Sequence, residues 1–131
     1  MPYRRRLLIP KNTSKESPEF IDVKMTKCII NQVEVSFPVG CYGLAGIQIW
    51  RGLHQLWPAN TGEWFAYDDI TIVFGVDYFL DEQPYILRVF GYNEDDTFPH
   101  NPVVRFVISK IIAVRKLTEP VSLIPQIWEM I

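Results

Sequence analysis

The sequence predicts an all-β chain, folded as one antiparallel β-sandwich of about eight short strands in a jelly-roll-like arrangement, with a small barrel as the alternative. Apolar and polar residues alternate with a period of two in several stretches, and turn residues separate these stretches at intervals of roughly 8–12 residues. Ten prolines accompany seven glycines in 131 residues, and long helix-forming runs are few. A chain of this length that is 48% hydrophobic buries a core without disulfide or metal staples.

The first half of the chain contains four predicted strands, at residues 19–25, 28–37, 44–50 and 54–57. In the second of them, Val33, Val35 and Phe37 alternate with polar residues, which predicts one wet face and one buried face. Gly46, inside the third strand, indicates a bulge or a close approach of another group to the backbone. Residues 58–62 are turn formers and end this half.

The second half contains four more predicted strands, at residues 70–74, 78–80, 85–90 and 103–108. The last two flank a polar connection in which Asn and Asp side chains favour turns and Pro99 and Pro102 disfavour helix. Alternating positions across the strands predict a buried core made of Val35, Phe37, Ile47, Ile49, Ile72, Leu87, Val89 and Phe106.

We divide the chain into a basic N-terminal arm and linker at 1–18, a sandwich at 19–109 and an apolar extension at 110–131. The arm is too charged to bury, and Pro120 and Pro125 interrupt the extension, so each needs a partner surface, although the extension folding back onto its own core is the alternative. Deleting 1–16 or 118–131 is therefore expected to leave a folded domain and to break an oligomer. The predicted subunit contacts are Arg4, Arg5, Arg6, Leu123, Ile124, Ile127, Trp128 and Ile131.

Charge is distributed unevenly around a net value of −2. Residues 1–27 are rich in Lys and Arg, residues 59–100 are rich in acids with Arg88 as their single base, and residues 101–117 are basic again. A solvated surface explains this pattern, and so does contact between the arm of one copy and an acidic face of the next, which predicts a homo-oligomer. The acidic folded part is not expected to bind nucleic acid, and no apolar run is long enough for a membrane helix.

Two groups of residues are candidates for ligand binding. The loop residues Asn93, Glu94, Asp95 and Asp96 offer oxygen ligands to a cation, but their spacing is not that of an EF-hand, and a structural turn is the competing interpretation. Among Trp50, Trp57, Trp64 and Tyr67, we single out Trp57 and Trp64 as a candidate aromatic platform for sugars, against the alternative that they are core residues.

Catalytic motifs are absent from the sequence. His54 and His100 have no nucleophile motif beside them, and Cys28 and Cys41 lack metal-ligand spacing. We expect two reduced thiols, with a disulfide as the open alternative, and we assign no catalytic residue, no metal ligand and no cofactor. An enzyme would need one of the histidines beside an acid in a cleft.

Two segments resemble small all-β proteins of tailed phages and prophage-like regions. The segments are VEVSFPVGCYGLAGIQIWRGLHQLWPANTGEWFAYDD and PYILRVFGYNEDDTFPHNPVVRF, which are similar to the patterns fPpG…HQ.wPtN and PY.l…wNeDdt..H over about residues 17–108, with Tyr92 as the aromatic before Asn93. The resemblance implies a virion setting and carries no activity with it.

These observations predict a non-enzymatic structural or assembly protein, a virion component such as a capsid-decorating, connector or fibre-associated subunit that contacts other virion proteins. The short apolar patch before Pro10 is too small for a secretory signal, so we expect synthesis in the host cytoplasm and assembly into the virion. The alternative function is a carbohydrate-binding or calcium-assisted adhesion module.

Overall fold

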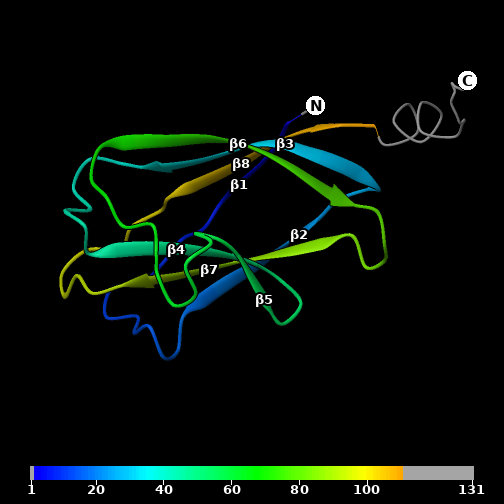
Figure 1. Ribbon diagram of the computed structural model, residues 1–131. Coiled ribbons are helices and arrows are strands. Elements are labelled where there is room, and N and C mark those ends of the chain that lie inside the picture. The colour runs from blue at the N-terminus through cyan, green and yellow to red at the C-terminus, as the bar shows by residue number, and fades with distance from the viewer. Residues whose placement is uncertain (1, 111–131) are drawn as a thin grey trace, which may run out of the picture.

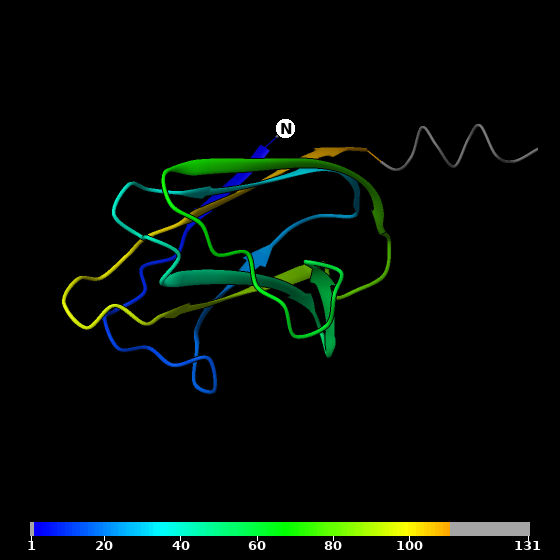
Figure 2. The same cartoon turned by 60° about the vertical axis from the view of Figure 1, so that its left-hand side comes forward.

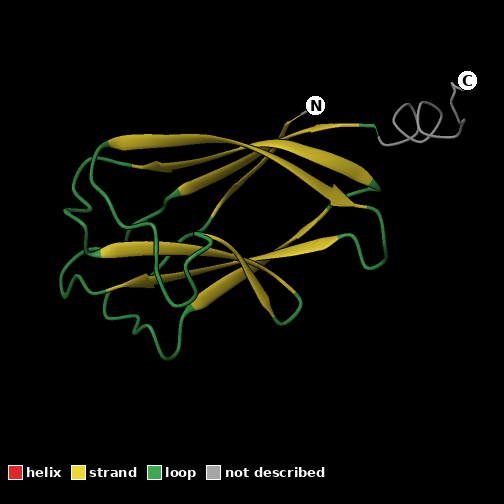
Figure 3. Ribbon diagram, viewed as in Figure 1, coloured by secondary structure: helices red, strands yellow, loops and turns green. Residues whose placement is uncertain are grey.

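The computed structural model describes residues 2–110, and in this part of the chain it confirms an antiparallel β-sandwich of eight strands without helices (Figures 1 and 3). The strands are β1 (Pro2–Arg6), β2 (Glu19–Lys24), β3 (Cys28–Phe37), β4 (Ala45–Arg51), β5 (His54–Trp57), β6 (Ile70–Leu80), β7 (Ile86–Asn93) and β8 (Val103–Ser109). Residues 2–110 hold no helix with the length and apolar character that a membrane crossing requires.

The strands form two four-stranded sheets, ordered β1-β8-β3-β6 and β2-β7-β4-β5. The chain crosses from one sheet to the other at every connection except the hairpin between β4 and β5. Every strand pair is antiparallel, and the two layers separate clearly when the molecule is turned (Figure 2). Each sheet therefore has one face toward the other sheet and one face toward the outside.

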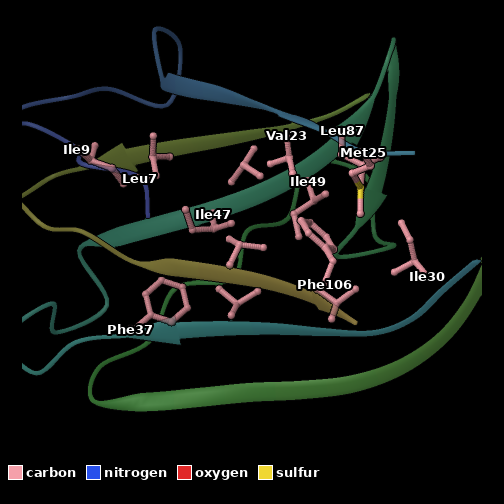
Figure 4. Packing of buried hydrophobic residues seen from close by; sticks show 14 of the residues in the cluster. Leu7, Ile9, Val23, Met25, Ile30, Phe37, Ile47, Ile49, Leu87 and Phe106 are labelled. Atoms are coloured by element: carbon pink, nitrogen blue, oxygen red, sulfur yellow. The ribbon is translucent and has the colours of Figure 1, made fainter. Parts of the chain in front are cut away.

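The core lies between the sheets and is formed by the alternating positions that the sequence indicates (Figure 4). The predicted core residues Val35, Phe37, Ile47, Ile49, Leu87, Val89 and Phe106 are all buried. Ile72 is only half-buried, because it lies near the start of β6, which is the outer strand of its sheet. The period-2 pattern thus identifies the inner face of the central strands, and the exception falls at an edge.

The predicted strands 70–74 and 78–80 are one continuous strand, β6. Its inward positions continue through Val76 to Tyr78, so the period of two is not interrupted at Gly75. The pairing with β3 shifts register between Ile30 and Gln32, which accommodates the extra length. The interruption that we expected near Gly75 is this register shift, which adjoins the Gln32–Gly75 pair, and β6 continues through it as one strand.

The expected boundary at residue 18 is wrong, because the N-terminal residues belong to the sandwich. Pro2–Arg6 form β1, which pairs with β8, and Leu7 and Ile9 behind it are buried at 3% and 0% exposure. The space for these two side chains exists because residue 91 is glycine. A Cβ atom at Gly91 would lie 2.6 Å from the terminal carbons of both Ile9 and Leu7. The arm is thus an edge strand followed by two core residues.

Candidate functional site

The outer face of the β2-β7-β4-β5 sheet carries a groove of about 580 Å³. Strand residues whose side chains point away from the core line its floor, because successive side chains along a strand point to opposite faces. The turn between β4 and β5 and the connection before β7 form one end. The lining residues are Lys15, Pro18, Asp22, Gln48, Trp50, Gly52, Leu53, Trp64, Pro84, Ile86, Arg88 and Phe90.

Two cross-strand rows run across this face of the sheet, and their members Asp22, Gln48, Arg88 and Phe90 line the groove. Phe20 of β2 is paired with Phe90 of β7, which is paired in turn with Gln48 of β4. The Phe90 ring lies 5.9 Å from that of Phe20 and 5.8 Å from that of Trp50, the latter in an edge-to-face arrangement. Such aromatic pairs stabilise a sheet face and leave apolar ring surface toward the outside.

An ion pair forms the second row. Asp22 of β2 is opposite Arg88 of β7, and the guanidinium donates two hydrogen bonds to the carboxylate, from Nε to Oδ1 at 2.7 Å and from Nη2 to Oδ2 at 3.1 Å. The hydrogen bond from Arg88 is the main reason that the pKa of Asp22 is lowered. The guanidinium also lies 4.0 Å from the centroid of the Phe20 ring. The floor therefore combines apolar rings with one fixed, oriented pair of charges.

The Trp50 indole is held in place by a buried amide. Its Nε1 donates to Gln48 Oε1 at 2.9 Å, and Gln48 Nε2 donates to the Glu63 carbonyl at 2.8 Å. The same loop places Trp64 edge-on to the Tyr92 ring, with centroids 4.8 Å apart. Tyr92 in turn covers Gly46, where a Cβ atom would overlap the ring, so the close approach predicted at Gly46 is confirmed. The wall of the groove is thus fixed before any ligand arrives.

The predicted platform of Trp57 and Trp64 does not form, because the two rings lie on different faces. Trp57 packs edge-on against Phe74 and Tyr78 beside the core, whereas Trp64 lines the outer groove. Trp50, and not Trp57, is the tryptophan that lines this groove with Trp64. The sequence contained a signal for Trp50, because it follows the inward-pointing Ile49 and its side chain is therefore expected on the outer face. Phe20 and Phe90 become neighbours only through strand pairing, which no local pattern indicates.

The acidic loop is held together by its own side chains. Asn93 is fully buried, and its Nδ2 donates to the carbonyls of Ile9 and Phe98 at 3.2 and 3.0 Å, while its Oδ1 accepts from the Asp95 backbone at 3.0 Å. Asp95 Oδ1 accepts from the backbone N–H groups of Thr97 and Phe98. Residues 2–110 contain no group of three His, Cys, Asp or Glu side chains arranged to hold a metal ion. These contacts favour the structural turn over the cation loop.

His100 and Asp95 form a shielded pair at the base of this loop. His100 Nε2 lies 2.9 Å from Asp95 Oδ2, and the two side chains are 9% and 12% exposed. Cys41 is close enough that Asp95 acts on it, but burial, followed by Asp68 and Asp95, raises the pKa of its thiol to about 11. A nucleophilic cysteine needs a lowered pKa. The three residues therefore lack the electrostatics of a thiol nucleophile with its base.

Replacing Asp95 with asparagine tests the charge of this carboxylate. The Thr97 backbone hydrogen bond, followed by His100, lowers the pKa of Asp95. A lowered folded-state pKa contributes stability above the unfolded value of about 3.9, and the contribution is lost as pH falls through the folded value. We expect Asp95→Asn to be less stable than the natural protein at pH 7, with the difference disappearing toward pH 2 in urea unfolding. The exposed Asp96→Asn is the control, and a pH-independent difference for Asp95→Asn would contradict the assignment.

Two residues of the sequence patterns, Gln55 and Asn93, hold loops in place with side-chain hydrogen bonds to the backbone. Gln55 Nε2 donates to the carbonyls of Pro58 and Asn60, and Gln55 Oε1 accepts from the Gly62 backbone at 3.0 Å. It therefore closes the turn at 58–62 that carries the chain to Trp64. Asn93 does the same for the loop that follows β7. Both residues thus hold loops that adjoin the β2-β7-β4-β5 sheet.

The three arginines of the N-terminus lie on β1. Arg4 is opposite Arg105 of β8, and Arg5 Nη1 donates to the Asp22 carbonyl of β2 at 3.2 Å, so Arg5 links the two sheets at their edge. The acids of 59–100 are spread along the molecule. Asp68 and Asp81 precede and follow β6, an eleven-residue strand, which separates them by roughly 35 Å. Contact between the basic arm of one copy and an acidic face of the next stays a prediction.

The remaining predicted contacts, Leu123, Ile124, Ile127, Trp128 and Ile131, lie outside the described residues. Cys28 and Cys41 are free, buried thiols.

No family model and no curated protein matches this chain.

Proposed function

We propose that this protein is a non-enzymatic assembly subunit that binds an apolar protein segment in the groove on the outer face of the β2-β7-β4-β5 sheet. We further propose that it is a virion component, such as a capsid-decorating, connector or fibre-associated subunit, made in the host cytoplasm and bound to copies of itself and to other virion proteins. The observation that carries the proposal is that this groove, on the face of the sheet that points away from the core, is lined by apolar and aromatic side chains.

The groove supports binding because it leaves apolar side chains exposed on the face of the sheet that points away from the core. The outer positions of an antiparallel sheet are ordinarily polar. Here Leu53, which is 92% exposed, lines the groove together with Trp50 and Phe90. Phe20, which is 48% exposed, packs beside Phe90. A contiguous apolar patch rimmed by polar groups is typical of an interaction surface.

The strand order supports the virion setting. We infer from the order β1-β8-β3-β6 facing β2-β7-β4-β5 that the sandwich is a jelly roll. Jelly rolls form viral capsid proteins and lectins. This is an analogy between folds, and it agrees with the resemblance of residues 17–108 to proteins of tailed phages.

A second candidate, carbohydrate binding, is favoured by the same groove. Trp50 and Trp64 present ring surface beside the Asp22–Arg88 pair, and rings next to charged hydrogen-bonding groups suit a sugar. Titration with oligosaccharides distinguishes the candidates. A saturable change in tryptophan fluorescence that Trp50→Ala abolishes would favour the sugar, whereas the assembly proposal expects no such change.

The assembly proposal predicts that the full-length protein is larger than a monomer. Mass-resolved light scattering of the full chain should give a mass at least twice that of the 15.3 kDa monomer. Removing 118–131 should shift the mass toward the monomer without loss of strand content in circular dichroism. Because apolar burial is not screened by salt, 1 M NaCl should leave the assembly intact. A monomer at every concentration would refute the proposal.

A further inference from the structure

The groove has a defined position relative to the end of β8. Ser109, the last residue of β8, is opposite Ile29, and Cys28 beside it is opposite Leu80 at the end of β6. The connection from β6 to β7 starts there, and its Pro84 lines the groove. The chain therefore leaves β8 at the end of the sandwich where β6 connects to β7 (Figures 1 and 2). Pro84 of that connection lines one end of the groove.

We propose that this groove receives residues 118–131 of a neighbouring copy of the same chain. That a copy supplies the segment rests on the proposed function. Residues 111–117 lie between the last described residue and this segment, and seven residues span at most about 25 Å. That reach is enough to cross from the end of one sandwich to the matching end of another when the two copies meet there.

The composition of the segment suits the groove. The sequence TEPVSLIPQIWEMI contains Leu123, Ile127 and Trp128, together with two prolines that keep it from joining a sheet as a central strand. A segment that cannot add to a sheet binds through its side chains, and proline-containing segments bind grooves lined by aromatic rings. Trp50, Trp64 and Phe90 provide such rings here.

Charge also matches. The segment carries Glu119 and Glu129 and no Lys or Arg. The charged residues that line the groove are Lys15, Arg88 and Asp22. Since Asp22 is paired with Arg88, the groove has one cation in excess, with Lys15 Nζ lying 4.9 Å from the Tyr92 ring centroid at its rim. An acidic, apolar segment is therefore preferred over a basic one.

Photocrosslinking of the full-length protein tests the pairing. Trp128→p-benzoylphenylalanine is expressed as two isotopically distinct pools, which are mixed, irradiated and digested. We expect crosslinks to peptides that contain Leu53, Ile86 or Phe90, with mixed-isotope products that show contact between copies. The same probe at Tyr42, which is 76% exposed and lies outside this groove, is the control and should not give these products.

A matched pair of surface variants gives an independent measurement. Leu53→Asp should weaken the oligomer about tenfold or more, because it replaces a leucine that the segment buries with a charge. Val39→Asp, at a position that is 73% exposed and outside this groove, should not. Crosslinks elsewhere with an intact oligomer would overturn the groove assignment while the proposed function stands. Crosslinks to the groove within single chains of a monomer would overturn both the copy as donor and the proposed assembly.

Discussion

Deleting residues 1–16 is expected to unfold the domain. The deletion removes β1 and the buried Leu7 and Ile9, and it leaves β8 as an unpaired edge. Each of these two side chains alone is worth about 2–5 kcal/mol when truncated in a core, whereas a whole domain has a stability of only about 5–15 kcal/mol. The deletion also removes the backbone bonds of Ile9 and Thr13 to His100 and Asn93. This expected result is the opposite of the one that the sequence alone supports, which is a folded domain after deletion of 1–16.

Thermal unfolding followed by circular dichroism checks this result. The deletion variant should lose its cooperative transition or aggregate through the exposed β8 edge. Removal of 118–131 is the control of similar length, and it should retain the transition. The double variant Arg4→Ser, Arg6→Ser keeps Leu7 and Ile9 and should stay folded. A cooperative transition near that of the full chain after deletion of 1–16 would show that β1 is dispensable.

Truncation of Leu87 to alanine is expected to cost about 2–5 kcal/mol of unfolding free energy, through lost burial and the cavity left behind. Leu87 is fully buried on the central strand β7, opposite Val23 of β2. Because β7 also pairs with β4, the side chain is enclosed by three strands and the opposite sheet. Little room is left for neighbours to relax into the cavity, so we expect the upper part of the range.

Urea unfolding at equilibrium measures this change. Val73→Ala on β6 is the control, since Val73 is 54% exposed on a strand, and exposed substitutions cost within about 0.5 kcal/mol. A loss below about 1 kcal/mol for Leu87→Ala would mean that the register of β7 is wrong, because a one-residue shift turns Leu87 toward the outside.

The groove and the N-terminal strand β1 could not be predicted from the sequence, for two different reasons. PYRRR has three consecutive charged residues and no alternation of apolar and polar residues, so the sequence indicated an arm. It forms a strand because β8 offers it a free edge with which to pair. Asp22 and Arg88 are 66 residues apart, and Phe20 and Phe90 are 70 apart by their numbers. No local pattern predicts that they meet.

The sequence by itself determined the fold class and the inner faces of the strands. Val35, Ile49, Leu87 and Phe106 are buried where the period of two places them, because burial on a strand depends on parity, which is a local property. Only the tertiary structure decided which strands are neighbours, what fills the space above Gly91 and which rings share the outer groove. Those features depend on pairing between distant segments, and the free energy of such pairing comes from contacts that exist only once the two sheets are assembled.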